Sequence, residues 1–191
     1  MPHHFAAIAF TPAVKRMQEQ MGSRPAYARM ESVEREANHR LTDEASQFIS
    51  ARDSFYMGTV SETGWPYVQH RGGPRGFVRV LDEGTIGFAD FKGNRQYVSV
   101  GNLMQDDRVS LFFMDYPNRV RLKLFGHARL VGLEDESLLQ RLVVPDYRGR
   151  VERGLVIAVE GFDWNCPQHI TPRFTHEELQ AANPFAGSAP L

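Results

Sequence analysis

Positively charged and apolar side chains alternate in the segment Arg119–Leu124. Successive side chains of a β-strand point to opposite faces, so a strand here would place Arg119, Arg121 and Lys123 on one face. Like charges that share a face repel each other unless an anion lies against them. The pattern therefore predicts an anion-binding face, and an ordinary solvated strand face explains it equally well.

The polar stretch 92–96, Lys-Gly-Asn-Arg-Gln, is a second candidate for anion binding. We expect it to open a short helix over 95–103, where free backbone N–H groups and the positive end of the helix dipole suit a phosphate. Arg95 adds a guanidinium group that can bind two phosphate oxygens. An ordinary capped helix start is the alternative, and it is the commoner origin of such a pattern. The stretch is not a P-loop, because no Gly-Lys-Ser/Thr follows at the required spacing.

The elements that would position these residues are mostly strands. Short turns and few helices favour an antiparallel barrel of about six strands, which is a mainly β fold with flanking helices. Runs rich in β-branched and aromatic residues, bounded by turn residues, predict strands at 54–61, 66–71, 77–81, 85–89, 109–114, 119–131 and 155–162.

The first part of the chain is expected to be helical. Thr11 followed by proline is typical of a helix start, and Thr42 caps another helix that should cover one end of the barrel. We expect an N-terminal helical segment over 1–50 that packs on the barrel, a barrel domain over 51–175, and a C-terminal tail over 176–191.

Composition and charge narrow the class of protein. The 191 residues are 42% hydrophobic and 24% charged, which is typical of one folded domain. The formal net charge of -1 provides no long-range field that would attract nucleic acid or an anionic membrane. No apolar run approaches the ~20 residues of a membrane helix. The single cysteine, Cys166, and a start without signal-peptide features lead us to expect a cytoplasmic protein.

Residues 50–131 carry a series of short motifs that resembles the FMN-binding core of the pyridoxamine 5'-phosphate oxidase family. The motifs match in order and spacing, and they are Gly-Trp-Pro-Tyr at 64–67, Phe-Ala-Asp at 88–90, Asn-Arg-Gln at 94–96, Arg-Val-Ser-Leu-Phe-Phe at 108–113 and a basic strand that ends at Gly126. The resemblance implies a six-stranded antiparallel split β-barrel. It also implies a homodimer that holds FMN at the subunit interface.

The resemblance also implies which residues hold the phosphate of FMN. The family's Ser-Arg-Lys motif falls on 94–96, where Arg95 is the retained cation. The family's arginine and lysine after Pro-Tyr fall on Gln69 and Pro74, so both charges are missing. Arg71 lies two residues beyond Gln69 on the same strand face and is the candidate to compensate.

Further contacts are implied from the second subunit, near Arg121 and Lys123. Trp164 is the candidate to cover the flavin ring from that subunit. The complete set of cofactor-binding residues that we expect is Gln69, His70, Arg71, Gly72, Ala89, Asp90, Asn94, Arg95, Gln96, Arg121, Lys123 and Trp164.

The C-terminal part departs from the family. Its Arg-Leu-His substrate motif is not found, and 163–169 reads Asp-Trp-Asn-Cys-Pro-Gln-His, so pyridoxamine phosphate as the substrate does not follow. Cys166 and His169 have a Cys-x-x-His spacing, but zinc needs four ligands and no second pair stands at a suitable spacing. We therefore expect no metal site.

The function that the resemblance implies is a flavin-dependent oxidoreductase acting on an unknown small substrate or electron donor. Arg71 or Lys123 would stabilise the reduced flavin, whose chemistry the cofactor supplies. His70 and His169 are candidates for a general base, because imidazole titrates near neutral pH; the catalytic residues stay unassigned. Two alternatives are a flavin-binding or electron-transfer protein without turnover, and a split barrel that uses a deazaflavin or haem.

Overall fold

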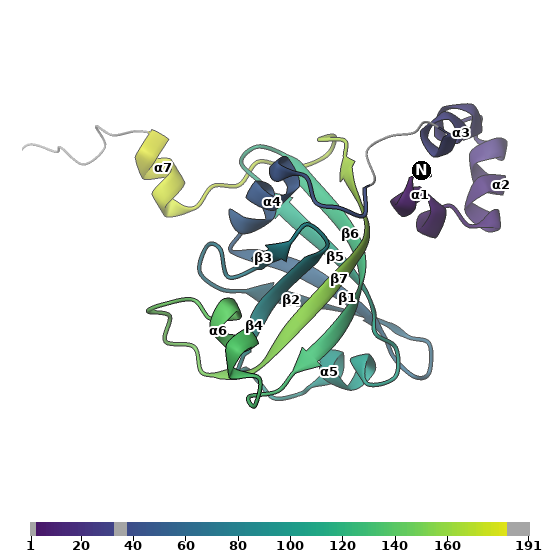
Figure 1. The fold of residues 1–191 in the computed structure, drawn as a ribbon. Helices are drawn as coiled ribbons and strands as arrows, with labels where there is room; N and C mark the ends of the chain where they lie inside the picture. The colour runs from purple at the N-terminus through teal and green to yellow at the C-terminus, as the bar shows by residue number, and fades with distance from the viewer. Residues whose placement is uncertain (1–2, 33–37, 183–191) are drawn as a thin grey trace, which may run out of the picture.

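The chain forms one antiparallel sheet of seven strands that coils into an open barrel (Figure 1). The structure is a computed structural model and describes residues 3–32 and 38–182. The strand order in the sheet is β2-β1-β5-β6-β7-β4-β3, so β2 and β3 form its two edges. The strands are β1 (Ser54–Val60), β2 (Pro66–Gly72), β3 (Arg79–Asp82), β4 (Thr85–Phe91), β5 (Arg108–Asp115), β6 (Val120–Val131) and β7 (Val151–Asn165).

The predicted mainly β fold with flanking helices is confirmed. Each of the seven predicted strand segments overlaps one strand of the sheet, which therefore has seven strands and not the six that we expected for the barrel. The short β3, at one edge, pairs only with β4. The basic strand begins at Val120, one residue later than predicted, because Arg119 has a φ of 55° and belongs to the preceding turn. Arg119 is therefore not part of the predicted row of cations.

Seven helices occur in the described residues and surround the sheet. Helices α1 to α3 lie together on one side, α4 lies at one end of the barrel, and α5 and α6 lie toward the other end (Figure 1). Within the described ranges, none of the helices combines the length and the hydrophobicity that crossing a bilayer requires. Their bounds are α1 (His4–Ala9), α2 (Pro12–Gln20), α3 (Arg24–Ser32), α4 (Asp43–Ser50), α5 (Val98–Leu103), α6 (Glu136–Leu142) and α7 (His176–Ala182).

The two predicted N-caps are confirmed. The side chain of Thr11 accepts a hydrogen bond from the backbone N of Val14, and that of Thr42 accepts one from the backbone N of Ala45. At the other end of the chain, α7 occupies the first part of the segment that we expected to be a tail. The remainder of that segment, 183–191, lies outside the described residues.

The main hydrophobic core fills the inside of the coiled sheet. Phe55, Phe113 and Leu122 are at most 1% exposed within it. Helix α4 covers one end of the core, as predicted, and contributes Ala45 and Ile49, which are fully buried. A second, smaller cluster lies under α6 and consists of Ala89, Val131, Leu139, Leu142 and Val156.

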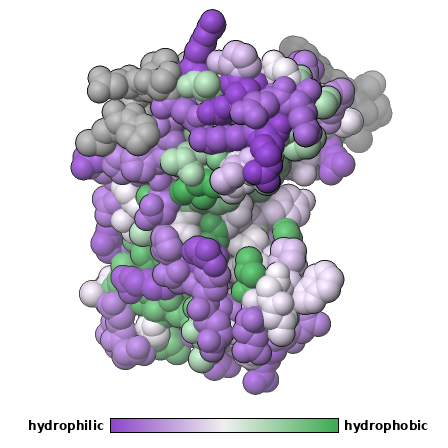
Figure 2. Space-filling model, turned by 90° about the vertical axis from the view of Figure 1, so that its right-hand side faces the viewer, coloured by the Kyte–Doolittle hydropathy of each residue, from purple (hydrophilic) through white to green (hydrophobic). Residues whose placement is uncertain are grey.

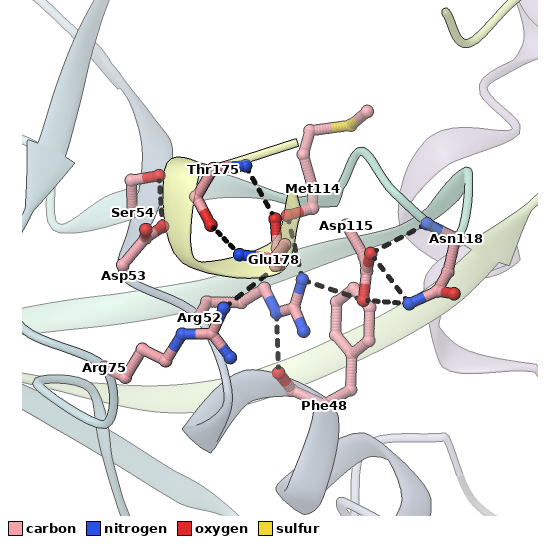
Figure 3. A network of polar contacts seen from close by, with 10 residues as sticks. All are labelled: Phe48, Arg52, Asp53, Ser54, Arg75, Met114, Asp115, Asn118, Thr175 and Glu178. Atoms are coloured by element: carbon pink, nitrogen blue, oxygen red, sulfur yellow. Dashed lines mark hydrogen bonds and ion pairs between the residues drawn. The ribbon is translucent and has the colours of Figure 1, made fainter. Parts of the chain in front are cut away.

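Arg52 ties the end of α4 to the turn between β5 and β6 (Figure 3). Its guanidinium group forms an ion pair with Asp115 at 2.9 Å, and its Nε donates a hydrogen bond to the carbonyl oxygen of Phe48 at 3.2 Å. Asp115 also accepts hydrogen bonds from the backbone N and the side chain of Asn118. Because both charged side chains are largely buried, their attraction is weakly screened and fixes the helix on the barrel.

A polar network also holds α7 against the barrel (Figure 3). Glu178 accepts a hydrogen bond from the backbone N of Thr175 at 2.8 Å, and the hydroxyl of Thr175 accepts one from the backbone N of Glu178 at 3.2 Å. These reciprocal bonds form a capping box, which satisfies free N–H groups at the helix start. Arg75, in the connection between β2 and β3, forms an ion pair with Glu178 at 3.0 Å.

Candidate cofactor site

Five of the predicted cofactor-binding residues line one cavity of about 250 Å³. They are Gln69, Arg71, Asp90, Asn94 and Arg95. Gln69 and Arg71 come from β2, and Asp90 comes from β4. These two strands lie near opposite edges of the sheet. The coil of the open barrel therefore brings the two ends of the sheet to one site.

Gln69 and Arg71 point to the same face of β2, as the alternation of side chains predicted. The side-chain oxygen of Gln69 accepts a hydrogen bond of 2.8 Å from Ser99 of α5. The guanidinium group of Arg71 forms an ion pair of 2.6 Å with Asp90. These contacts connect β2 to α5 and to β4 across the cavity.

Asp90 lies between two arginine side chains. Besides its contact with Arg71, it lies 3.5 Å from the Nε of Arg153 on β7. Burial raises the pKa of Asp90 above its usual value, although both guanidinium groups act in the opposite direction. The carboxyl group of Asp90 is thus held inside the site by contacts with two guanidinium groups.

A second carboxylate, Glu152, faces the same cavity. Arg153 contacts it at 3.2 Å, and the hydroxyl of Tyr97 donates a hydrogen bond to it at 3.3 Å. The Nε of Arg95 donates a hydrogen bond to the same hydroxyl at 3.3 Å. The sequence interpretation missed Glu152 and Arg153, because the last strand was expected to begin at 155 and it begins at Val151. Recognising the earlier strand start would have placed both residues in the sheet.

Asn94 and Arg95 reach the cavity from a loop, so the predicted helix start at 95 is wrong. Helix α5 begins at Val98. Arg95 and Tyr97 have φ values of 63° and 56°, a left-handed conformation that is incompatible with a right-handed helix. Asn94 accepts a hydrogen bond from the backbone N of Gln96 at 3.2 Å, which is typical of an Asx turn. The helix-dipole argument for a phosphate at this stretch does not apply.

The structure does not bring four other predicted residues to the cavity. His70 alternates with Gln69 and Arg71 on β2, so its ring points to the opposite face and packs against Tyr56. Gly72 lies at the end of the same strand, beside His70. Ala89 is buried under α6, and Gln96 is exposed to solvent beside the cavity.

Arg121 and Lys123 share the outer face of β6, as predicted, while Leu122 between them points into the core. Lys123 forms an ion pair with Asp163 of β7 at 3.1 Å, and its ammonium group lies 4.4 Å from the centre of the Phe5 ring of α1. A carboxylate of the same chain therefore relieves part of the repulsion between these cations. Neither side chain lines the cavity of its own chain.

Residues of the C-terminal motif lie away from the cavity. The ring of Trp164 packs edge-to-face on Phe48 at 4.9 Å and belongs to the border of the main core. Cys166 and His169 are both exposed. In the part of the chain that the structure describes, no group of three or more His, Cys, Asp or Glu residues has a geometry that would hold a metal ion.

A much larger apolar groove, of about 850 Å³, lies on the outer face of the sheet. It is formed by β1, β2, β5 and β6, and Val68, Phe112 and Phe125 are among its lining residues. Figure 2 looks onto the side where α1 to α3 lie, and hydrophobic side chains gather there in a hollow below the hydrophilic helices. Phe125 follows Arg121 and Lys123 on the same face of β6, so the groove and the two cations share one surface.

Three solved structures are similar to the chain. A candidate pyridoxamine 5'-phosphate oxidase from Lactobacillus delbrueckii aligns with a TM-score of 0.50 at 18% identity, over 65% of this chain and 94% of that chain. An FMN-binding protein from Syntrophomonas wolfei aligns with a TM-score of 0.47 at 14% identity, over 78% and 97% of the two chains. An F420 reductase aligns with a TM-score of 0.44 at 16% identity, over 64% and 98%. At 18% identity, the likeness to the first of these structures concerns the fold alone.

No curated protein matches the sequence. The family model described as pyridoxamine 5'-phosphate oxidase matches residues 41–158, which is well over half of the chain and includes β1 to β6. This stretch also contains every predicted residue that lines the cavity. The chain belongs to the pyridoxamine 5'-phosphate oxidase family.

Proposed function

We propose that the chain binds FMN as a homodimer and acts as a flavin-dependent oxidoreductase on a small substrate. One observation carries the proposal, namely the cavity in which Gln69, Arg71, Asn94 and Arg95 meet. The resemblance assigns these positions to the flavin phosphate, or places them beside it. Their convergence from separate elements supports a common ligand.

The chemistry of the cavity fits a phosphate group. Arg71 and Arg95 supply guanidinium donors, and charge-assisted hydrogen bonds to an anion are roughly twice as strong as neutral ones. The Nε of Arg71, a residue that lines the cavity, is buried and makes no hydrogen bond to any residue that the structure describes.

The size of the cavity supports a site that a second copy of the chain completes. Its volume of about 250 Å³ is below the ~300–1,000 Å³ that is typical of pockets for cofactor-sized ligands. The cavity would accommodate the phosphate end, and the ring system would need further surface. The apolar groove on the outer face is of the kind that binds a partner protein. Arg121 and Lys123 lie beside it, and they are the residues that the resemblance assigns to the contact from the second subunit.

The roles of the protein in the reaction are binding, orientation and charge. Bound FMN would supply the redox chemistry, which is hydride transfer from the small substrate or electron donor and passage of the electrons to an acceptor. Arg71 would hold the phosphate end, and a cation such as Lys123 from a second copy would favour the anionic reduced flavin. The ionisable groups that line the cavity are the two arginines, Asp90, Tyr97 and Glu152, and none is an imidazole. The predicted general bases His70 and His169 remain unassigned.

The absorption spectrum of the purified protein tests the cofactor. We expect the two bands of an oxidised flavin, and either the single band of a deazaflavin or the Soret band of a haem would reject FMN. Anaerobic addition of NADH or NADPH should then bleach the long-wavelength flavin band. Bound flavin that no donor bleaches would favour the binding protein without turnover, and a protein that takes up no added FMN would contradict the proposal as a whole.

A further inference from the structure

Two carboxylates of the chain, Asp90 and Glu152, form ion pairs with guanidinium groups around the cavity. Asp90 contacts Arg71 at 2.6 Å and Arg153 at 3.5 Å, and Glu152 contacts Arg153 at 3.2 Å. The four side chains are between 10 and 21% exposed. At such burial the attraction between the charges is less screened than it would be on the surface.

The charges that line the cavity are balanced. Arg71 and Arg95 carry two positive charges, and Asp90 and Glu152 carry two negative charges. A phosphate that enters must compete with the carboxylates for the same donors and is repelled by them at short range. This arrangement differs from a simple cluster of cations, which would attract any anion.

The connectivity of the network explains how the carboxylates act on both arginines that line the cavity. Asp90 contacts Arg71 directly. Glu152 acts on Arg95 through the hydroxyl of Tyr97, which donates to Glu152 and accepts from the Nε of Arg95. Each cation of the cavity is therefore connected to one internal anion.

We propose that Asp90 and Glu152 are specificity-determining residues that set how strongly the cavity prefers a phosphorylated ligand over its unphosphorylated form. The inference rests on the proposed function, because the ligand pair that tests it is FMN and riboflavin. The two molecules share the ring and the ribityl chain, and they differ only in the phosphate group. Removing one internal negative charge should strengthen the binding of FMN and leave the binding of riboflavin unchanged.

The experiment measures the dissociation constants of FMN and riboflavin for Asp90→Asn and Glu152→Gln by flavin fluorescence at fixed ionic strength. Both substitutions keep the size of the side chain and remove its charge. We expect FMN to bind at least about tenfold more tightly to each variant, with riboflavin within about twofold of the wild type. The matched control is Glu83→Gln, which removes one negative charge from an ion pair with Arg40 outside the cavity and the apolar groove and should change neither constant.

The outcomes separate this inference from the proposed function. Weaker or unchanged FMN binding in both variants would overturn the inference and would indicate that the carboxylates serve to position the arginines. If Asp90→Asn does not fold, as judged by its thermal melt, Glu152→Gln decides the question in the same way.

Inorganic phosphate is the second probe, followed by the broadening of its ³¹P resonance. It should bind both variants more tightly than the wild type, whatever organic group the natural ligand carries. A protein that binds no flavin but shows this gain would reject FMN and retain the inference. Equal phosphate binding by wild type and variants would reject the inference.

Discussion

Arg71 and Arg95 face the same cavity with different support from the chain. Arg71 is largely buried and paired with Asp90, whereas Arg95 is exposed and contacts the hydroxyl of Tyr97. A phosphate would have to share Arg71 with a carboxylate. Arg95, in contrast, contacts the neutral hydroxyl of Tyr97. We therefore expect Arg95 to contribute more than Arg71 to the binding energy of a phosphate.

Arg95→Ala should therefore weaken FMN binding, because the phosphate loses a hydrogen bond to a charged group. We expect a dissociation constant that is roughly tenfold higher or more. Titration of the apoprotein with FMN measures the change. Arg40→Ala removes an exposed arginine outside the cavity and serves as the control. An unchanged constant for the Arg95 variant would remove this residue from the site.

Asp106 provides a residue-level test of the local electrostatics. The guanidinium group and the backbone N of Arg108 donate hydrogen bonds to its carboxylate and lower its pKa to about 2. Carboxyl NMR of the wild type should give this value, and in Arg108→Gln the pKa of Asp106 should return toward the ordinary ~3.9. A wild-type midpoint near the ordinary value would contradict the contact.

The same shift predicts how stability depends on pH. Because the pKa of Asp106 is lower in the folded state, its ionisation contributes stability above the unfolded pKa of ~3.9. The contribution is lost as the pH falls through about 2. The melting temperatures of wild type and Arg108→Gln should therefore differ most above about pH 4 and converge toward pH 2.

At the scale of elements, the longest pair in the sheet is β6 with β7, and it bends at Gly126. The pairing register shifts between Phe125 and Gly126, which marks a β-bulge. A Cβ atom on Gly126 would lie 2.4 Å from the carbonyl oxygen of Ala158 and 2.8 Å from a methyl carbon of Ile157. The close approach of the two backbones thus depends on the missing side chain.

Gly126→Ala should lower the free energy of unfolding by ~1–3 kcal/mol, the usual cost of forcing an extra methyl group into a packed site. Denaturation in urea measures it. In the control Gly101→Ala, the new Cβ meets nothing within 4 Å, and alanine should stabilise α5 by roughly 0.5–1 kcal/mol. Equal stability of the Gly126 variant and the wild type would mean that the bulge adapts to a side chain.

For the molecule as a whole, the apolar groove is a surface that the proposed site does not use within one chain. Val68, Tyr56 and Val60 line it and are 64, 37 and 36% exposed. Exposed apolar patches of this kind mark interaction surfaces in soluble proteins. Burial against a second copy would explain both the groove and the cations beside it.

Val68→Glu should convert the proposed dimer to a monomer, because an unpaired charge buried in an apolar interface costs several kcal/mol. The fold should tolerate the change, since Val68 is exposed within one chain. Multi-angle light scattering measures the mass, with Leu133→Glu as the control at an exposed leucine outside the groove. A variant that stays dimeric would place the interface elsewhere, and a monomeric wild type would contradict the dimer.

Features that depend on near neighbours along the chain could be predicted from the sequence. The alternation of side chains placed Gln69 with Arg71 and Arg121 with Lys123 on common faces, and both assignments are confirmed. The caps at Thr11 and Thr42 were predictable for the same reason, because a cap bonds to an N–H three residues away.

Which strand faces meet depends on the fold of the whole chain. The alternation of side chains along β2 places His70 and Arg71 on opposite faces of the strand. Which of the two faces lines a cavity depends on how the sheet coils. The pairing of Arg71 with Asp90 joins strands that lie at different ends of the sheet, and the sequence holds no local signal for it. The contacts of Asp90 and Glu152 with these arginines follow from long-range packing. Short-range patterns along the sequence indicated the donors but not their partners.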